Sequence, residues 1–126
     1  MSVTTMRVLA GLLAIPMGLS AIGWLGNPAE AAQSLGMPLL DGVGRSTQVG
    51  DFFAFFAAGT VMIVLGAWRA SPAWLLAAAA LLGFAAVGRT LAALLHGAPF
   101  MPPFIGFEVV SAALLVSAAV VISKRA

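Results

Sequence analysis

Four long runs of apolar residues alternate with short polar stretches along the chain. They cover about residues 8–25, 47–67, 73–95 and 103–122. Each has the roughly 20 residues that an α-helix needs to cross a bilayer. The connections at 68–72 and 96–102 are short, which makes neighbouring helices antiparallel. The pattern predicts an all-α protein in which residues 1–126 form a single integral membrane domain, an antiparallel bundle of four transmembrane helices.

The connection between the first two runs, Gly26 to Ser46, is longer than the others and has helix signals of its own. Asn27 can cap a helix, Pro28 suits its first position, and Glu30 follows in the first turn. Gly36 is typical of a helix end. We expect a short interfacial helix at 28–35, which either orders the connection or covers a site.

The first run carries two further signals. Pro16 removes a backbone hydrogen bond and is expected to bend the helix. Arg7, the apolar stretch and the triplet at 29–31 also imitate a signal peptide. The run exceeds the usual ~7–15 apolar residues of a signal peptide, so we expect it to be retained as a transmembrane helix.

The composition supports a membrane protein and excludes several functions. Hydrophobic residues make up 62% of the chain and charged residues only 8%, against roughly 25% charged residues in soluble domains. The absence of cysteine excludes disulfides, thiolate metal sites and thiol redox chemistry. A net charge of only +2 gives no reason to expect nucleic-acid binding. We expect the three tryptophans to be interfacial anchors: Trp24, Trp68 and Trp74.

The positive charges outside the apolar runs predict the orientation. Cytoplasmic loops of membrane proteins are enriched in lysine and arginine. Four cations would share one side of the membrane, and Arg45 with two acidic residues would lie on the other. The four are Arg7, Arg69, Lys124 and Arg125. The pattern therefore predicts a multi-pass protein with both termini in the cytoplasm.

Three charged residues fall within the apolar runs: Asp51, Arg89 and Glu108. Counted from the expected helix ends, all three lie roughly 6–9 Å below the outer membrane boundary at ~1.5 Å rise per residue. Charges inside a membrane are costly and usually pair with one another or face water. We therefore expect Arg89 to bridge Asp51 and Glu108 within the bundle.

Other polar or aromatic residues share helix faces with these charges. Gln48 and Phe55 lie near Asp51, Ser111 near Glu108, and His96 two turns after Arg89. If Asp51, Arg89 and Glu108 are all ionised, the cluster has a net charge of −1. Either one carboxyl is protonated, His96 is cationic, or a bound cation or basic ligand completes the cluster. A lone histidine without further ligands does not form a metal motif.

The cluster permits two interpretations. It can be structural, because a buried ion cluster fixes which helices meet and the helix dipoles favour these charges near these ends. It can also be a ligand or proton site. The sequence contains no nucleotide loop, nucleophile triad or phosphate-binding glycine motif, and it leaves any cofactor unknown.

Several short motifs resemble one family of small four-span bacterial membrane proteins, known only as a domain of unknown function and distantly similar to the DoxX group. They are Pro28, Leu35-Gly36-Met37-Pro38, Gly44-Arg45-Ser46, Gly50-Asp51, Gly88-Arg89-Thr90, His96-Gly97 and Glu108. The resemblance implies a four-helix bundle in the bacterial inner membrane, with Asp51, Arg89 and Glu108 at polar positions. It implies no established reaction. DoxX-like proteins are linked to respiratory and redox systems, but the lack of cysteine argues against direct thiol chemistry here.

Three functional hypotheses follow. The first is a non-enzymatic protein that binds, and through this transports or senses, a small hydrophobic or amphipathic molecule in an outer-facing cavity at the polar cluster. The second is an accessory subunit of a larger membrane complex, with a purely structural cluster. The third is an intramembrane enzyme that uses Glu108 or Asp51 as acid or base. Small residues at four-residue spacing would also allow a homo-oligomer, although packing within one chain explains them more simply.

Overall fold

The computed structural model describes all 126 residues and contains only helices joined by turns and loops. Its helices are α1 (Val3–Leu12), α2 (Ala14–Gly26), α3 (Pro28–Ser34), α4 (Gly42–Trp68), α5 (Pro72–His96) and α6 (Pro102–Arg125). Four helical segments are long and apolar enough to cross a membrane. The first, Val3–Gly26, consists of α1 and α2 taken together. The predicted all-α class with four long apolar helices is confirmed.

The chain divides into two compact units. Unit 1 consists of Met1–Leu12 and Met62–Ala126, and unit 2 consists of Leu13–Val61. One boundary falls between α1 and α2, and the other falls within α4. The single domain expected from the sequence stays a prediction.

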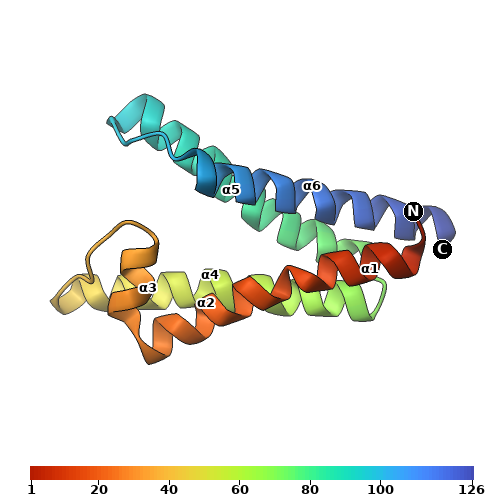
Figure 1. The fold of residues 1–126 in the computed structure, drawn as a ribbon, viewed down its shortest axis with the longest axis horizontal. Helices are drawn as coiled ribbons and strands as arrows, with labels where there is room; N and C mark the ends of the chain where they lie inside the picture. Colours follow the sequence, from red (N-terminus) through yellow and green to blue (C-terminus); the bar gives the residue numbers. More distant parts are fainter. The chain divides into compact units, whose positions relative to one another are not determined.

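Unit 1 is built around α5 and α6, which run antiparallel beside each other and are joined by residues 97–101 (Figure 1). Buried apolar side chains recur every seven residues on each helix: Leu75 and Leu82 on α5, and Leu115 and Ile122 on α6. This spacing keeps one face of a helix towards its neighbour over several turns. It creates a packed seam that runs along the helix pair.

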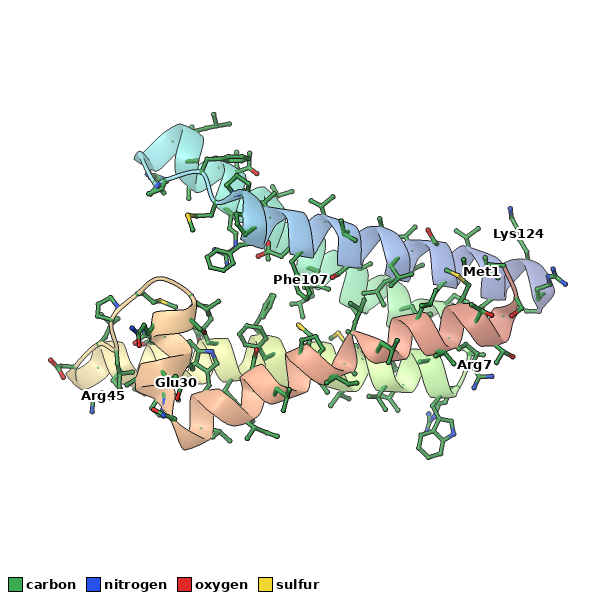
Figure 2. The ribbon with its side chains drawn as sticks, in the orientation of Figure 1. Met1, Arg7, Glu30, Arg45, Phe107 and Lys124 are labelled. Carbon is green, nitrogen blue, oxygen red and sulfur yellow. The ribbon has the colours of Figure 1, made fainter.

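Both ends of the chain lie at one end of unit 1, as the labelled Met1, Arg7 and Lys124 show (Figure 2). Arg7 does more there than add positive charge. Its Nε donates a hydrogen bond to the carbonyl oxygen of Ala67 at 2.6 Å, and its Nη2 donates to that of Trp68. The last carbonyls of a helix have no partner within it. Arg7 therefore caps the end of α4 from a segment about 60 residues away.

The first apolar run is interrupted where the proline predicts. α1 ends at Leu12, Leu13 forms a turn, and α2 begins at Ala14. Pro16 has no N–H to donate to the carbonyl of Leu12, and its ring crowds that carbonyl. The next hydrogen bond, from the N–H of Met17 to the oxygen of Leu13, is long at 3.4 Å. The missing donor explains why the helix breaks one turn before the proline.

Unit 2 contains α2, α3 and the first part of α4. The side chain of Asn27 caps α3: its Oδ1 accepts from the N–H of Glu30 at 3.4 Å, and its Nδ2 donates to Oε2 of Glu30 at 2.9 Å. The pair differs from a capping box, because Glu30 accepts from the side-chain amide of Asn27, whereas the Asn27 N–H bonds to the carbonyl oxygen of Gly23. After the helix, Gly36 adopts φ 81°, which a glycine tolerates without strain. The short helix expected in this connection is therefore present and ends as predicted.

Trp24 packs inside unit 2. Its ring stacks on that of Phe52 with centroids 4.8 Å apart and planes 9° apart, and the residue is 1% exposed. The expectation of an interfacial anchor is wrong for Trp24, because the face of α2 that carries it is the face that meets α4. Trp68, in contrast, is 78% exposed.

The second long helix begins earlier than its apolar run. α4 starts at Gly42, five residues before the expected start at 47. Arg45 explains the extension: its Nη2 pairs with Asp41 at 2.9 Å, and its Nε donates to the carbonyl oxygen of Leu40 at 2.8 Å. An ion pair at i, i+4 supports a helical turn that hydrophobicity alone does not reveal. Asp51 accordingly lies nine residues into the helix, about 14 Å from its start.

Candidate functional site

Arg89 on α5 and Glu108 on α6 form an ion pair within unit 1. Nε of Arg89 donates a hydrogen bond to Oε1 of Glu108 at 2.6 Å. The Glu108 side chain is only 7% exposed, and that of Arg89 is 33% exposed. The structure thus brings together two of the three charged residues that were expected to meet. The short distance is that of a charge-assisted hydrogen bond.

The apolar seam sets the position of this pair. Arg89 lies seven residues after Leu82, and Glu108 lies seven residues before Leu115. Both charged residues therefore continue the buried heptad positions of their helices towards the connection at 97–101. The pair occupies the end of the seam that is opposite the chain termini. A polar pair at such a position fixes the register in which two helices meet.

Phe104 contacts the same guanidinium group. The Cζ atom of Arg89 lies 4.8 Å from the centroid of the Phe104 ring, within the range of a cation–π interaction. Phe104 precedes Glu108 by one helical turn, so both side chains project from the same side of α6. The guanidinium is therefore held by a carboxylate and an aromatic ring of one helix.

The second oxygen of Glu108 has no partner. Oε2 is buried and makes no hydrogen bond. More than nine in ten buried polar groups in proteins have a partner, and an unsatisfied group costs about 1–3 kcal/mol, or more when it is charged. One oxygen of the carboxylate, Oε1, therefore accepts a hydrogen bond, whereas the other, Oε2, accepts none. The unfilled oxygen is the most unusual polar feature of unit 1.

Ser111 and His96 differ in how they relate to the pair. Ser111 follows Glu108 by one turn on α6 and is buried at 2% exposure. His96 is exposed in the last turn of α5 and forms no hydrogen bond or ion pair with Arg89 or Glu108. α5 ends there because Gly97 adopts a left-handed conformation, φ 68°. The histidine is at the helix terminus, beyond the packed part of the seam.

Gln48 is buried in unit 2 and satisfied by the chain itself. Its Oε1 accepts from the N–H of Leu40 at 2.9 Å, and its Nε2 donates to the carbonyl oxygen of Pro38 at 3.1 Å. The amide therefore holds the segment that leads from α3 into α4. Sequence reasoning placed Gln48 on the Asp51 face but could not foresee that a loop folds back onto it.

Asp51 and Phe55 lie on α4 within unit 2. Asp51 is exposed at the surface of the chain. Phe55 is partly buried and packs edge to face on Phe56, with centroids 5.1 Å apart. Arg89 belongs to unit 1, so the bridge from Arg89 to Asp51 stays a prediction.

Unit 2 also contains a cavity that sequence reasoning did not identify as a site. It measures about 360 Å³ and lies among α2, α3 and the first part of α4. Its polar lining includes Ser20, Asn27, Glu30 and Ser34, and its aromatic lining consists of Trp24 and Phe56. The sequence offered one indication of this cavity: the short helix expected at 28–35. One of its two interpretations was that it covers a site.

No group of three or more histidine, cysteine or acidic side chains lies close enough together to hold a metal ion. The comparisons with known proteins add no further assignment. No family model, no curated protein and no solved structure matches the chain.

Proposed function

We propose that this chain is a multi-pass protein of the bacterial inner membrane that binds a small amphipathic molecule at the Arg89–Glu108 pair. The four long apolar helices support the membrane location. The unpartnered Oε2 of Glu108 is the observation that carries the binding proposal. Membership of the four-span family that the motifs resemble is part of the same proposal.

The polar groups define what the head of such a molecule must offer. Oε2 of Glu108 accepts a hydrogen bond and cannot donate one when the carboxyl is ionised. A hydroxyl or ammonium group on the ligand would fill it once the side chains that bury Oε2 move aside. Arg89 uses its Nε for Glu108, which leaves the two terminal amino groups available on a side chain that is one-third exposed. An acceptor on the same ligand head would complete the site.

The proposed orientation follows from the ends of unit 1. Arg7 and Lys124 lie at the same end as the termini (Figure 2), and cations favour the cytoplasmic side. The Arg89–Glu108 pair lies towards the opposite end, within α5 and α6 and on the side of the connection at 97–101. We therefore assign the pair to the outer half of the membrane, where an amphipathic molecule in the outer leaflet reaches it with its head.

The alternative is a structural subunit in which the pair only fixes the helices. The heptad position of both residues favours this alternative, because a polar pair there fixes the register of the two helices. It leaves the free oxygen of Glu108 and the exposed part of Arg89 without a role. The two functions differ in one respect. Only the binding function requires that a ligand with a hydrogen-bond donor stabilise the protein through Oε2.

The test compares 1-decanol with decane in purified protein in maltoside micelles, with the thermal unfolding midpoint as the measurement. Decanol should raise the midpoint more than decane, because only decanol donates a hydrogen bond. Glu108→Met should abolish the difference, because its side chain offers the hydroxyl no strong hydrogen-bond partner, whereas the amide of a glutamine could still donate to the hydroxyl oxygen. Ser117→Ala is the matched control: this exposed hydroxyl on α6 donates only to its own helix, to Ala113 at 2.8 Å. Equal midpoints with decanol and decane would leave the structural subunit as the better account.

A further inference from the structure

The cavity of unit 2 is a second candidate site, independent of the Arg89–Glu108 pair. It lies among α2, α3 and the first part of α4. Glu30, one of its lining residues, belongs to α3 (Figure 2). Its volume of about 360 Å³ falls at the small end of the ~300–1,000 Å³ range of small-molecule sites. Its occupant is therefore a compact group.

The charge of the cavity comes from Glu30. Oε2 of Glu30 accepts from Asn27 at 2.9 Å, and no hydrogen bond reaches its Oε1. Unit 2 contains three acidic residues and one cation, Arg45. Arg45 is already paired with Asp41 at 2.9 Å. Within unit 2, the carboxylate of Glu30 therefore has no cationic partner from the chain.

Aromatic rings complete the lining. Trp24 and Phe56 border the cavity together with the carboxylate. The face of an aromatic ring attracts a cation, and Phe56 is the ring that can offer one here. One face of Trp24 is stacked on Phe52 and the residue is 1% exposed, so Trp24 contributes a buried apolar border. The hydroxyl groups of Ser20 and Ser34 also line the cavity. This combination selects a positive group with an apolar surface over a strongly hydrated metal ion.

We propose that this cavity binds an alkylated ammonium group, either as a free small cation or as the head group of a lipid. The exposed carboxylate of Glu30 supplies the charge, and Phe56 contacts the alkyl groups beside the buried Trp24. Asn27 holds the carboxylate in place through the cap of α3. The short helix is thus both an ordered connection and one wall of the site.

Trp24 reports on occupancy because it lines the cavity. The protein has three tryptophans, so Trp68→Phe with Trp74→Phe leaves Trp24 as the single emitter. The probes are three nitroxide quenchers of the same ring, bearing a trimethylammonium, a hydroxyl or a carboxylate group. They are titrated into protein in maltoside micelles, which carry no ammonium group. The trimethylammonium probe should quench saturably, at a concentration at least about tenfold below the other two.

Glu30→Gln tests the role of the charge, because the side-chain oxygen of glutamine can still accept the hydrogen bond from Nδ2 of Asn27. It should remove the advantage of the trimethylammonium probe. Asp41→Asn is the matched control, since it removes an acidic group of unit 2 that does not line the cavity, and it should keep the advantage. Equal quenching by the three probes, or an advantage that survives Glu30→Gln, would overturn the proposal.

Competition needs no change at Glu30 and therefore remains decisive if that variant fails to fold. Choline should relieve the quenching, whereas 3,3-dimethylbutan-1-ol, its uncharged analogue of similar shape, should not. Dihexanoylphosphatidylcholine separates the two sources: relief at lower concentration than choline identifies a lipid head group, and the reverse order identifies a free cation. Failure of both ammonium compounds to compete would refute the site.

Discussion

Arg89 and Glu108 share one short hydrogen bond, of 2.6 Å, but they are buried to different extents. The carboxylate is almost fully enclosed, whereas the guanidinium keeps a third of its side-chain surface. Loss of the arginine therefore leaves a buried carboxylate without a countercharge, whereas loss of the carboxylate leaves a guanidinium that is still partly exposed. Removing Arg89 and removing Glu108 should therefore change the stability of the protein by different amounts, so stability measurements can test the pair.

Arg89→Gln should destabilise the protein by about 2–3 kcal/mol. Loss of one partner of a fully buried pair costs about 3–5 kcal/mol because it leaves a charge uncompensated, and we reduce this figure because Arg89 is one-third exposed. The double variant Arg89→Gln with Glu108→Gln should recover part of the loss, since no buried charge remains. Unfolding by heat or denaturing detergent measures both effects.

Arg45→Gln is the control for this comparison. Arg45 also pairs with a carboxylate, but the Asp41 side chain is 98% exposed, so we expect almost no change in stability. If Arg89→Gln is as harmless as Arg45→Gln, the ion pair does not hold α5 and α6 together.

Gly66→Ala should lower the stability of unit 1. An added Cβ at Gly66 would lie 2.5 Å from Cδ2 of Leu75, 2.7 Å from its Cγ and 3.0 Å from its backbone nitrogen. Leu75 is fully buried and cannot move away without displacing its neighbours. Overpacking of this kind costs about 1–3 kcal/mol. Gly83→Ala is the matched control, because its Cβ would meet no atom within 4 Å. Equal thermal midpoints for the two variants would show that α4 and α5 do not approach this closely.

Gln48→Leu should loosen the segment that precedes α4. The substitution preserves bulk and removes the hydrogen bonds to Leu40 and Pro38. Each such bond contributes about 0.5–1.5 kcal/mol, so hydrogen exchange at the Leu40 amide should accelerate several-fold to about tenfold. Gln33→Leu, at an exposed position of α3, should leave that rate unchanged. An unaltered rate in Gln48→Leu would mean that this amide does not fasten the loop.

The orientation can be tested with single cysteines, because the chain contains none. Ser123→Cys lies near the C-terminus and Gln33→Cys lies on α3. A membrane-impermeant maleimide added to intact spheroplasts should label Gln33→Cys and spare Ser123→Cys until the membrane is permeabilised. The reverse pattern would place the termini outside and would transfer the Arg89–Glu108 pair to the inner half of the membrane.

The sequence by itself determined the helices and their ends. Apolar length defines the four long helices, Pro16 accounts for the break in the first, and Asn27 with Glu30 starts the short one. These features depend on interactions between residues no more than about four positions apart, which a sequence displays directly. The starts of α1 at Val3 and of α4 at Gly42 each come five residues before the expected apolar run. Before the apolar run of α4 lies a polar turn held by Arg45 and Asp41.

The tertiary structure decided which faces meet. In a membrane helix, the side that packs on a neighbour and the side that faces lipid are both apolar, so the pattern does not distinguish them. For this reason the burial of Trp24, the close approach of Leu75 to Gly66 and the loop held by Gln48 could not be read in advance. The charged residues were visible as candidates, but the free oxygen of Glu108 exists only because of how α5 and α6 pack.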